Sequence, residues 1–127
     1  MEKFELKESV KVPRILIDYK KGEIKITGKS IIKNPSEFYP RLENLFKLYT
    51  ANPQPLTYLL IDLYYTPESR QYLFSIIKSL TELEKNNCSK VFISWHYDPD
   101  DYHIISDINK FSVDLNYKIN AYAYEVI

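Results

Sequence analysis

The chain has 127 residues, 45% of them hydrophobic, which is enough for one domain with a sizeable core. Its 17 basic residues balance 17 acidic ones, and this neutrality argues against a nucleic-acid binder or a polybasic membrane anchor. No apolar run approaches the roughly 20 residues of a membrane span. The first residues are charged, unlike a signal peptide, and the single cysteine, Cys88, cannot form an internal disulfide. Together these features predict a cytoplasmic protein.

The first part of the chain predicts a hairpin. Residues 1–12 are weakly patterned, and we expect either a flexible arm or a short edge strand there. Residues 14–19 form an apolar stretch, and 23–28 alternate polar and apolar side chains as a half-buried strand does. Between them lies a short turn in which Gly22 can take positive φ.

A helix and a central strand follow. Asn34 is expected to cap the first helix, with Pro35 at its first position and Glu37 reaching back to the cap. Pro40 predicts either a kink or a regular helix that starts only at that residue. The nearly continuous apolar run 56–65 predicts a central strand covered on both faces.

The remaining elements alternate between helix and strand. The stretch 66–69 opens a second helix, 91–97 reads as a strand, 98–101 begins a third helix, and 119–126 forms the last strand. We therefore expect a single α/β (α+β) domain over residues 1–127. Its sheet should be mixed and mostly parallel, in the order β-β-α-β-α-β-α-β, with helices packed on the sheet.

Few residues suggest catalysis. With only Gly22 and Gly28, the chain has no glycine-rich phosphate loop. Cys88 lies between Asn87 and Ser89 in a helix-to-strand loop, and it would need a basic partner near it to act as a nucleophile. We expect no enzymatic activity, no cofactor and no metal. The alternative is a small metal-dependent enzyme that uses His96, Asp98 and His103 as ligands. The carboxylates in that cluster, which also include Asp100 and Asp101, are equally explained as the start of the third helix.

The junction at residues 66–69 offers a different chemistry. Thr66 and Ser69 place hydroxyls where a buried strand meets a helix, and the free amides of a helix start receive phosphate well. The same residues are also an ordinary helix start, with Thr66 as its cap.

Several segments in this order and spacing are similar to one known family. They are 24–30 in the hairpin, 34–39 at the first helix, 63–65 in the central strand and 94–98 after the second helix. Over about residues 13–124 the chain resembles the SiaC family of bacterial regulatory phosphoproteins, which is STAS-like by analogy.

The resemblance implies a partner-switch protein in cyclic-di-GMP signalling and biofilm regulation. Such a protein binds and activates a diguanylate cyclase, is phosphorylated by a dedicated Ser/Thr kinase and is restored by a PP2C-type phosphatase. It implies protein partners, and neither nucleic acid nor membrane. The acceptor in the family lies in a Ser/Thr-rich stretch between the central strand and the next helix.

This chain departs from the family at the acceptor. Counting back from Trp95 without a gap places the acceptor at Glu68. Glu68 either imitates the phosphorylated residue, or the acceptor has moved to Ser69 or Thr66, or phosphorylation is lost and the protein is a constitutive scaffold. The switch candidates are therefore Thr66, Glu68 and Ser69. The residues expected to bind a partner are Tyr65 and Arg70.

Overall fold

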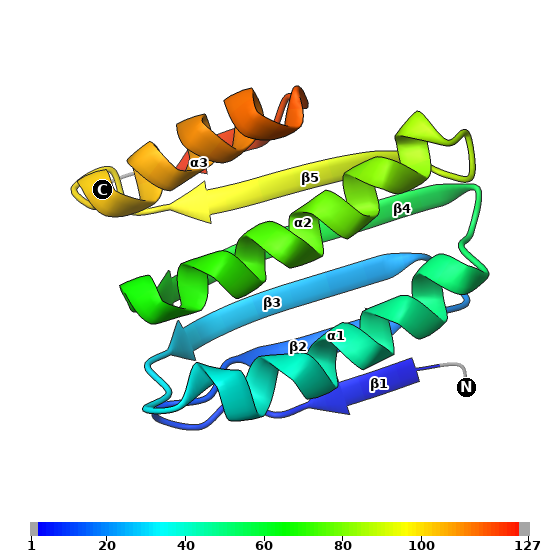
Figure 1. The fold of residues 1–127 in the computed structure, drawn as a ribbon. Helices are drawn as coiled ribbons and strands as arrows, with labels where there is room; N and C mark the ends of the chain where they lie inside the picture. Colours follow the sequence, from blue (N-terminus) through cyan, green and yellow to red (C-terminus); the bar gives the residue numbers. More distant parts are fainter. Residues whose placement is uncertain (1–2, 125–127) are drawn as a thin grey trace.

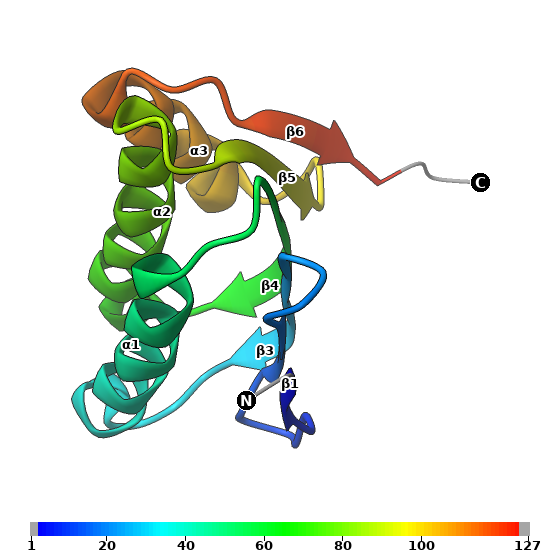
Figure 2. The ribbon, with the colours of Figure 1, turned by 90° about the vertical axis from the view of Figure 1, so that its right-hand side faces the viewer.

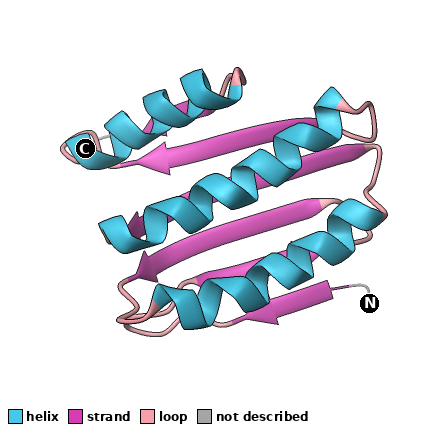
Figure 3. Cartoon of the chain, in the orientation of Figure 1, coloured by secondary structure: helices cyan, strands magenta, loops and turns pink. Residues whose placement is uncertain are grey.

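The computed structural model describes residues 3–124, which form a single sheet with its three long helices on one side (Figures 1 and 3). No helix within these residues is long and apolar enough to cross a membrane. The elements are β1 (Lys3–Leu6), β2 (Arg14–Asp18), β3 (Glu23–Ser30), α1 (Pro35–Ala51), β4 (Leu56–Tyr65), the 3₁₀ turn η1 (Pro67–Ser69), α2 (Arg70–Lys85), β5 (Lys90–Tyr97), α3 (Tyr102–Leu115) and β6 (Asn120–Ala123).

The sheet contains its strands in the order of the sequence, from β1 to β6. The β1–β2 and β2–β3 pairs are antiparallel, and the three following pairs are parallel. The expected mixed, mostly parallel α/β sheet is therefore confirmed. Because each parallel strand is added on the same side of the preceding one, right-handed crossovers place every helix on the same face. Figure 2 shows this arrangement edge-on.

The core lies between that face and the helices. Alternate residues of the long strands point toward the helices, and α2 contributes an apolar stripe spaced as one helix face. The fully buried side chains include Trp95 and Tyr39, both at 0% exposure. Trp95 packs against Phe111 of α3, with ring centroids 5.9 Å apart.

The expectation that strand 56–65 is covered on both faces is wrong. The segment is an interior strand, β4, but its side chains alternate between buried and accessible. Leu59, Ile61 and Leu63 are buried, whereas Tyr58 is 44% and Tyr64 54% exposed. Because all crossovers run on one face, nothing in the described chain covers the other, and tyrosine tolerates this because its hydroxyl stays in water.

The hairpin is present as predicted, with β2 and β3 antiparallel. Gly22 in its turn has a φ of +69°, and a Cβ at this position would lie 2.3 Å from the Leu56 carbonyl oxygen. Both the conformation and the close approach require glycine. Of the two alternatives for residues 1–12, the structure has an edge strand, β1, paired with β2.

The helix starts differ in detail from the expectation. Neither the Asn34 nor the Thr66 side chain caps its helix, and α1 runs unbroken through Pro40. The third helix begins at Tyr102, after the 98–101 stretch, and Asp101 caps it by accepting a bond from the Ile104 amide at 3.2 Å. β6 covers only part of the expected strand 119–126, and residues 125 and 126 lie outside the described residues.

Candidate functional site

The junction between β4 and α2 lies at the carboxyl edge of the sheet. Ser30 and Tyr65 are paired at the ends of the neighbouring parallel strands β3 and β4. The Thr66 amide donates to the Ser30 carbonyl at 3.2 Å, and the Ser69 amide donates to the Thr66 carbonyl at 3.0 Å. The first bond ties the end of β4 to β3, and the second closes the turn η1. The carboxyl edge is where parallel α/β sheets bind their ligands.

The hydroxyls of the junction face inward. Ser69 is 0% exposed, and its Oγ lies 3.2 Å from Ser30 Oγ, which in turn lies 2.6 Å from the Tyr39 hydroxyl. Burial raises the pKa of Tyr39, so this hydroxyl stays protonated and able to donate. Thr66 Oγ1 is buried and has no hydrogen-bond partner among residues 3–124. Glu68, by contrast, is exposed, so its carboxylate is the charged group that the turn presents to solvent.

A buried carboxylate ties the junction to α3. The Tyr65 hydroxyl donates to Asp107 Oδ2 at 2.6 Å, and Arg70 Nε lies 2.8 Å from Oδ1 of the same residue. The Arg70 guanidinium also contacts His103 Nδ1 at 2.9 Å. Burial, followed by the bond to Asp107, raises the pKa of Tyr65 far above its usual range. Arg70 is thus held toward α3 and away from Glu68.

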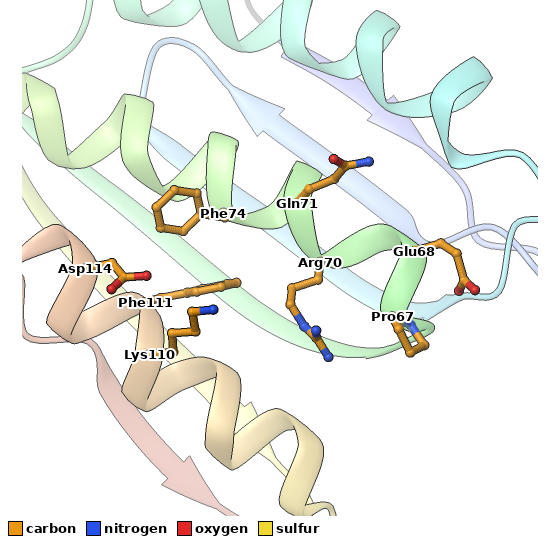
Figure 4. Close-up of a pocket in the computed structure, with 8 residues that line it drawn as sticks. All are labelled: Pro67, Glu68, Arg70, Gln71, Phe74, Lys110, Phe111 and Asp114. Carbon is orange, nitrogen blue, oxygen red and sulfur yellow. The ribbon is translucent and has the colours of Figure 1, made fainter.

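A groove of about 460 Å³ opens beside this cluster, between α2 and α3 (Figure 4). Its apolar wall is the edge-to-face pair Phe74 and Phe111, with ring centroids 5.1 Å apart. Apart from Pro67, the rest of the lining is polar and carries charges of both signs. The complete lining is Pro67, Glu68, Arg70, Gln71, Phe74, Lys110, Phe111 and Asp114. An apolar wall with a charged rim suits a protein segment with an apolar anchor.

The structure distinguishes the residues expected from sequence. Glu68 and Arg70 line the groove, whereas Tyr65 is only 3% exposed and its hydroxyl is bonded to the buried Asp107, so Tyr65 offers little surface for direct contact. The sequence reasoning missed Asp107, Phe74, Lys110 and Phe111. One signal was available: Asp107 falls on the apolar stripe of α3, where a carboxylate needs a buried partner.

The residues considered as metal ligands do not form a ligand set. Within residues 3–124, no group of three or more His, Cys, Asp or Glu is arranged to hold a metal ion. His96 stacks on Tyr122 at 5.2 Å between ring centroids, and His103 is engaged by Arg70. The metal-dependent alternative therefore finds no support in this geometry.

Comparison with known proteins gives a consistent assignment. Three solved structures of Pseudomonas aeruginosa proteins share the fold. SiaC aligns with a TM-score of 0.83 and 21% identity, over 98% of this chain and 100% of that one. Apo-SiaC aligns with a TM-score of 0.82 and 21% identity, over 97% and 100% of the two chains. A complex of the diguanylate cyclase SiaD with its activator SiaC aligns with a TM-score of 0.82 and 20% identity, over 95% and 99%.

At these identities the solved structures establish the fold alone. No protein among the curated sequences matches the chain. The model of the SiaC family regulatory phosphoproteins matches residues 6–124, which is nearly the whole chain. The chain therefore belongs to the SiaC family of regulatory phosphoproteins.

Proposed function

We propose that this protein works by binding and regulating a signalling enzyme, a diguanylate cyclase, and not by catalysis. The observation that carries the proposal is the groove between α2 and α3, which is continuous with the exposed carboxylate of Glu68. The family assignment supports a regulatory role. A protein of the same fold has been solved as the activator of a diguanylate cyclase.

The charge at the junction is the proposed control. Glu68 carries one negative charge at the turn, and Arg70 does not neutralise it because Asp107 and His103 hold the guanidinium. A kinase could reach Thr66 or Ser69 only if η1 opened, since both hydroxyl oxygens are buried. In the closed turn Glu68 thus sets the local charge, and a kinase and a PP2C-type phosphatase would act on the opened turn.

The test uses the diguanylate cyclases encoded in the same genome. Each is purified, and its affinity for the full chain is measured by calorimetry together with its rate of cyclic-di-GMP synthesis. We expect one cyclase to bind and its rate to change. Lys110→Glu reverses a charge on the groove rim and should weaken binding at least tenfold. Glu68→Ser should strengthen it, because it removes the charge that imitates a modified residue.

Lys47→Glu is the matched control, because Lys47 is an exposed lysine on α1, which lies on the far side of α2 from the groove (Figure 1). It should bind like the wild type. Equal affinities for Lys110→Glu and the wild type would rule out the groove. Binding without any change in synthesis would identify a scaffold. If no cyclase bound, the class of partner would be wrong.

A further inference from the structure

We propose that a second copy of this chain binds the open face of the sheet, defined as the side chains of β2–β6 that point away from the helices. This inference goes beyond the proposed function and concerns the opposite side of the molecule from the α2–α3 groove. Figure 2 shows the described helices on one side of the sheet and no element on the other.

The open face carries exposed apolar side chains. Five of the ten large hydrophobic side chains exposed among residues 3–124 lie on it: Leu56, Tyr58, Tyr64, Phe92 and Tyr122. They are already ordered against neighbours, since Tyr58 stacks on Phe92 at 5.3 Å and Tyr122 stacks on His96. A contiguous patch of this kind on a small protein marks an interaction site, and rigid aromatic side chains lose little entropy when they bind.

The sequence of β4 suits pairing with its own copy. Its outward residues are Leu56, Tyr58, Leu60, Asp62 and Tyr64, and Leu60 is at the centre. Consider a two-fold axis that lies in the interface, crosses β4 at Leu60 and runs perpendicular to the strands. It places Leu60 against Leu60, Leu56 against Tyr64, and the Tyr58 hydroxyl against the Asp62 carboxylate.

The neighbouring strand β5 fits the same axis. Leu60 is in register with Ser94, so the axis also passes Ser94 and brings Phe92 opposite His96. It also brings Lys90 near the exposed Asp98, which directly follows the end of β5, so an acidic residue lies close to Lys90 on each side of the axis. On β3 the axis places Lys25, which is beside Leu60, near its own copy, and it places Lys29 toward Lys21 of the second copy.

The charge balance and size of the face favour a second copy over other partners. On the long strands, Lys25, Lys29 and Lys90 exceed Glu23 and Asp62 by a single positive charge, so the face offers no strongly basic surface for nucleic acid. The strands β2 to β6 together contain 35 residues. Each residue extends a strand by about 3.3 Å, and neighbouring strands lie about 4.8 Å apart. The backbone footprint of the face is therefore roughly 550 Å² per copy, not counting the side chains that project from it, against ~800 Å² per partner in a standard interface.

Sedimentation of the full chain from about 1 to 100 μM tests the proposal. We expect a dimer, and we expect Leu60→Asp to raise its dissociation constant at least 100-fold, because two carboxylates then meet at the axis. The matched control is Leu48→Asp, at a residue 58% exposed on α1, which should leave association unchanged. Thermal unfolding of each variant shows that it is folded.

A charge swap tests the register independently of any change in the apolar centre. Lys90→Asp and Asp98→Lys should each weaken the dimer about fivefold or more, and the double variant should restore most of the affinity. A chain that stays monomeric at 100 μM would overturn the proposal. So would a dimer that tolerates Leu60→Asp or is lost in Leu48→Asp. A dimer that the double swap fails to restore would overturn the antiparallel register.

Discussion

The buried Ser69 hydroxyl leads to a prediction about phosphate-mimicking variants. Ser69→Asp replaces one oxygen by a carboxylate, which adds two heavy atoms at a site with 0% exposure. Over-packing of a close-packed site costs about 1–3 kcal/mol. The new charge would lie beside the Ser30 and Tyr39 hydroxyls, while the nearby Arg70 is committed to Asp107. The cost of burying this charge adds to the cost of over-packing, so we expect Ser69→Asp to lower the free energy of unfolding by about 3 kcal/mol or more.

Urea unfolding followed by far-ultraviolet circular dichroism measures this loss. Ser69→Ala removes only the 3.2 Å bond to Ser30 and should cost about 1 kcal/mol. Glu68→Ser, at the exposed neighbour, should stay within about 0.5 kcal/mol of the wild type. If Ser69→Asp were as stable as Glu68→Ser, the turn η1 would be open in solution and the reasoning refuted. If Ser69→Asp is destabilised as expected, a loss of partner binding in this variant would reflect damage to the fold and not a switch.

Two further variants test the hairpin and the alkaline stability. Gly22→Ala should lower the free energy of unfolding, measured with urea, by about 2 kcal/mol or more. An alanine in the left-handed conformation costs about 1–2 kcal/mol, and its Cβ would also approach the Leu56 carbonyl too closely. A urea midpoint equal to that of the wild type would contradict this turn geometry. Burial raises the pKa of Tyr117 to about 12, whereas the pKa of tyrosine in the unfolded chain is about 10. The stabilising contribution of Tyr117 is therefore complete below pH 10 and declines as the pH rises toward 12. Tyr117→Phe should therefore show a shallower fall of the urea midpoint between pH 10 and 12, and an unchanged slope would contradict this assignment.

The elements of the fold could be read from sequence because their signals are local. The turn glycine Gly22 and the alternation in 23–28 specify the hairpin, and the apolar run 56–65 identifies an interior strand. The coverage of that strand could not be read. A doubly wound sheet reverses its strand order and carries helices on both faces, whereas this sheet grows in one direction. Strand order depends on tertiary packing, so the apolar run is compatible with both arrangements.

The candidate site could be read only in part. Residues 66–70 were found because they adjoin one another at a strand-to-helix junction. Asp107 lies 37 residues beyond Arg70 in the chain, and only the packing of α3 beside α2 brings the two together. The sequence also could not show that the hydroxyls of the junction point into the protein. A short 3₁₀ turn precedes α2 and directs Ser69 toward Ser30, whereas the sequence pattern indicates only that a helix starts there.

The one-sided fold separates the two proposed surfaces. Consecutive residues of β4 serve different faces: the Tyr65 hydroxyl reaches Asp107 beneath the helices, while Tyr64 is 54% exposed on the open face. In the two-fold arrangement proposed above, the open faces meet and both α2–α3 grooves point outward. A dimer could therefore hold two partner molecules at once, and neither event requires the other. Leu60→Asp should leave the affinity for a cyclase unchanged, and Lys110→Glu should leave sedimentation unchanged. The two variants thereby distinguish a failure of self-association from a failure of partner binding.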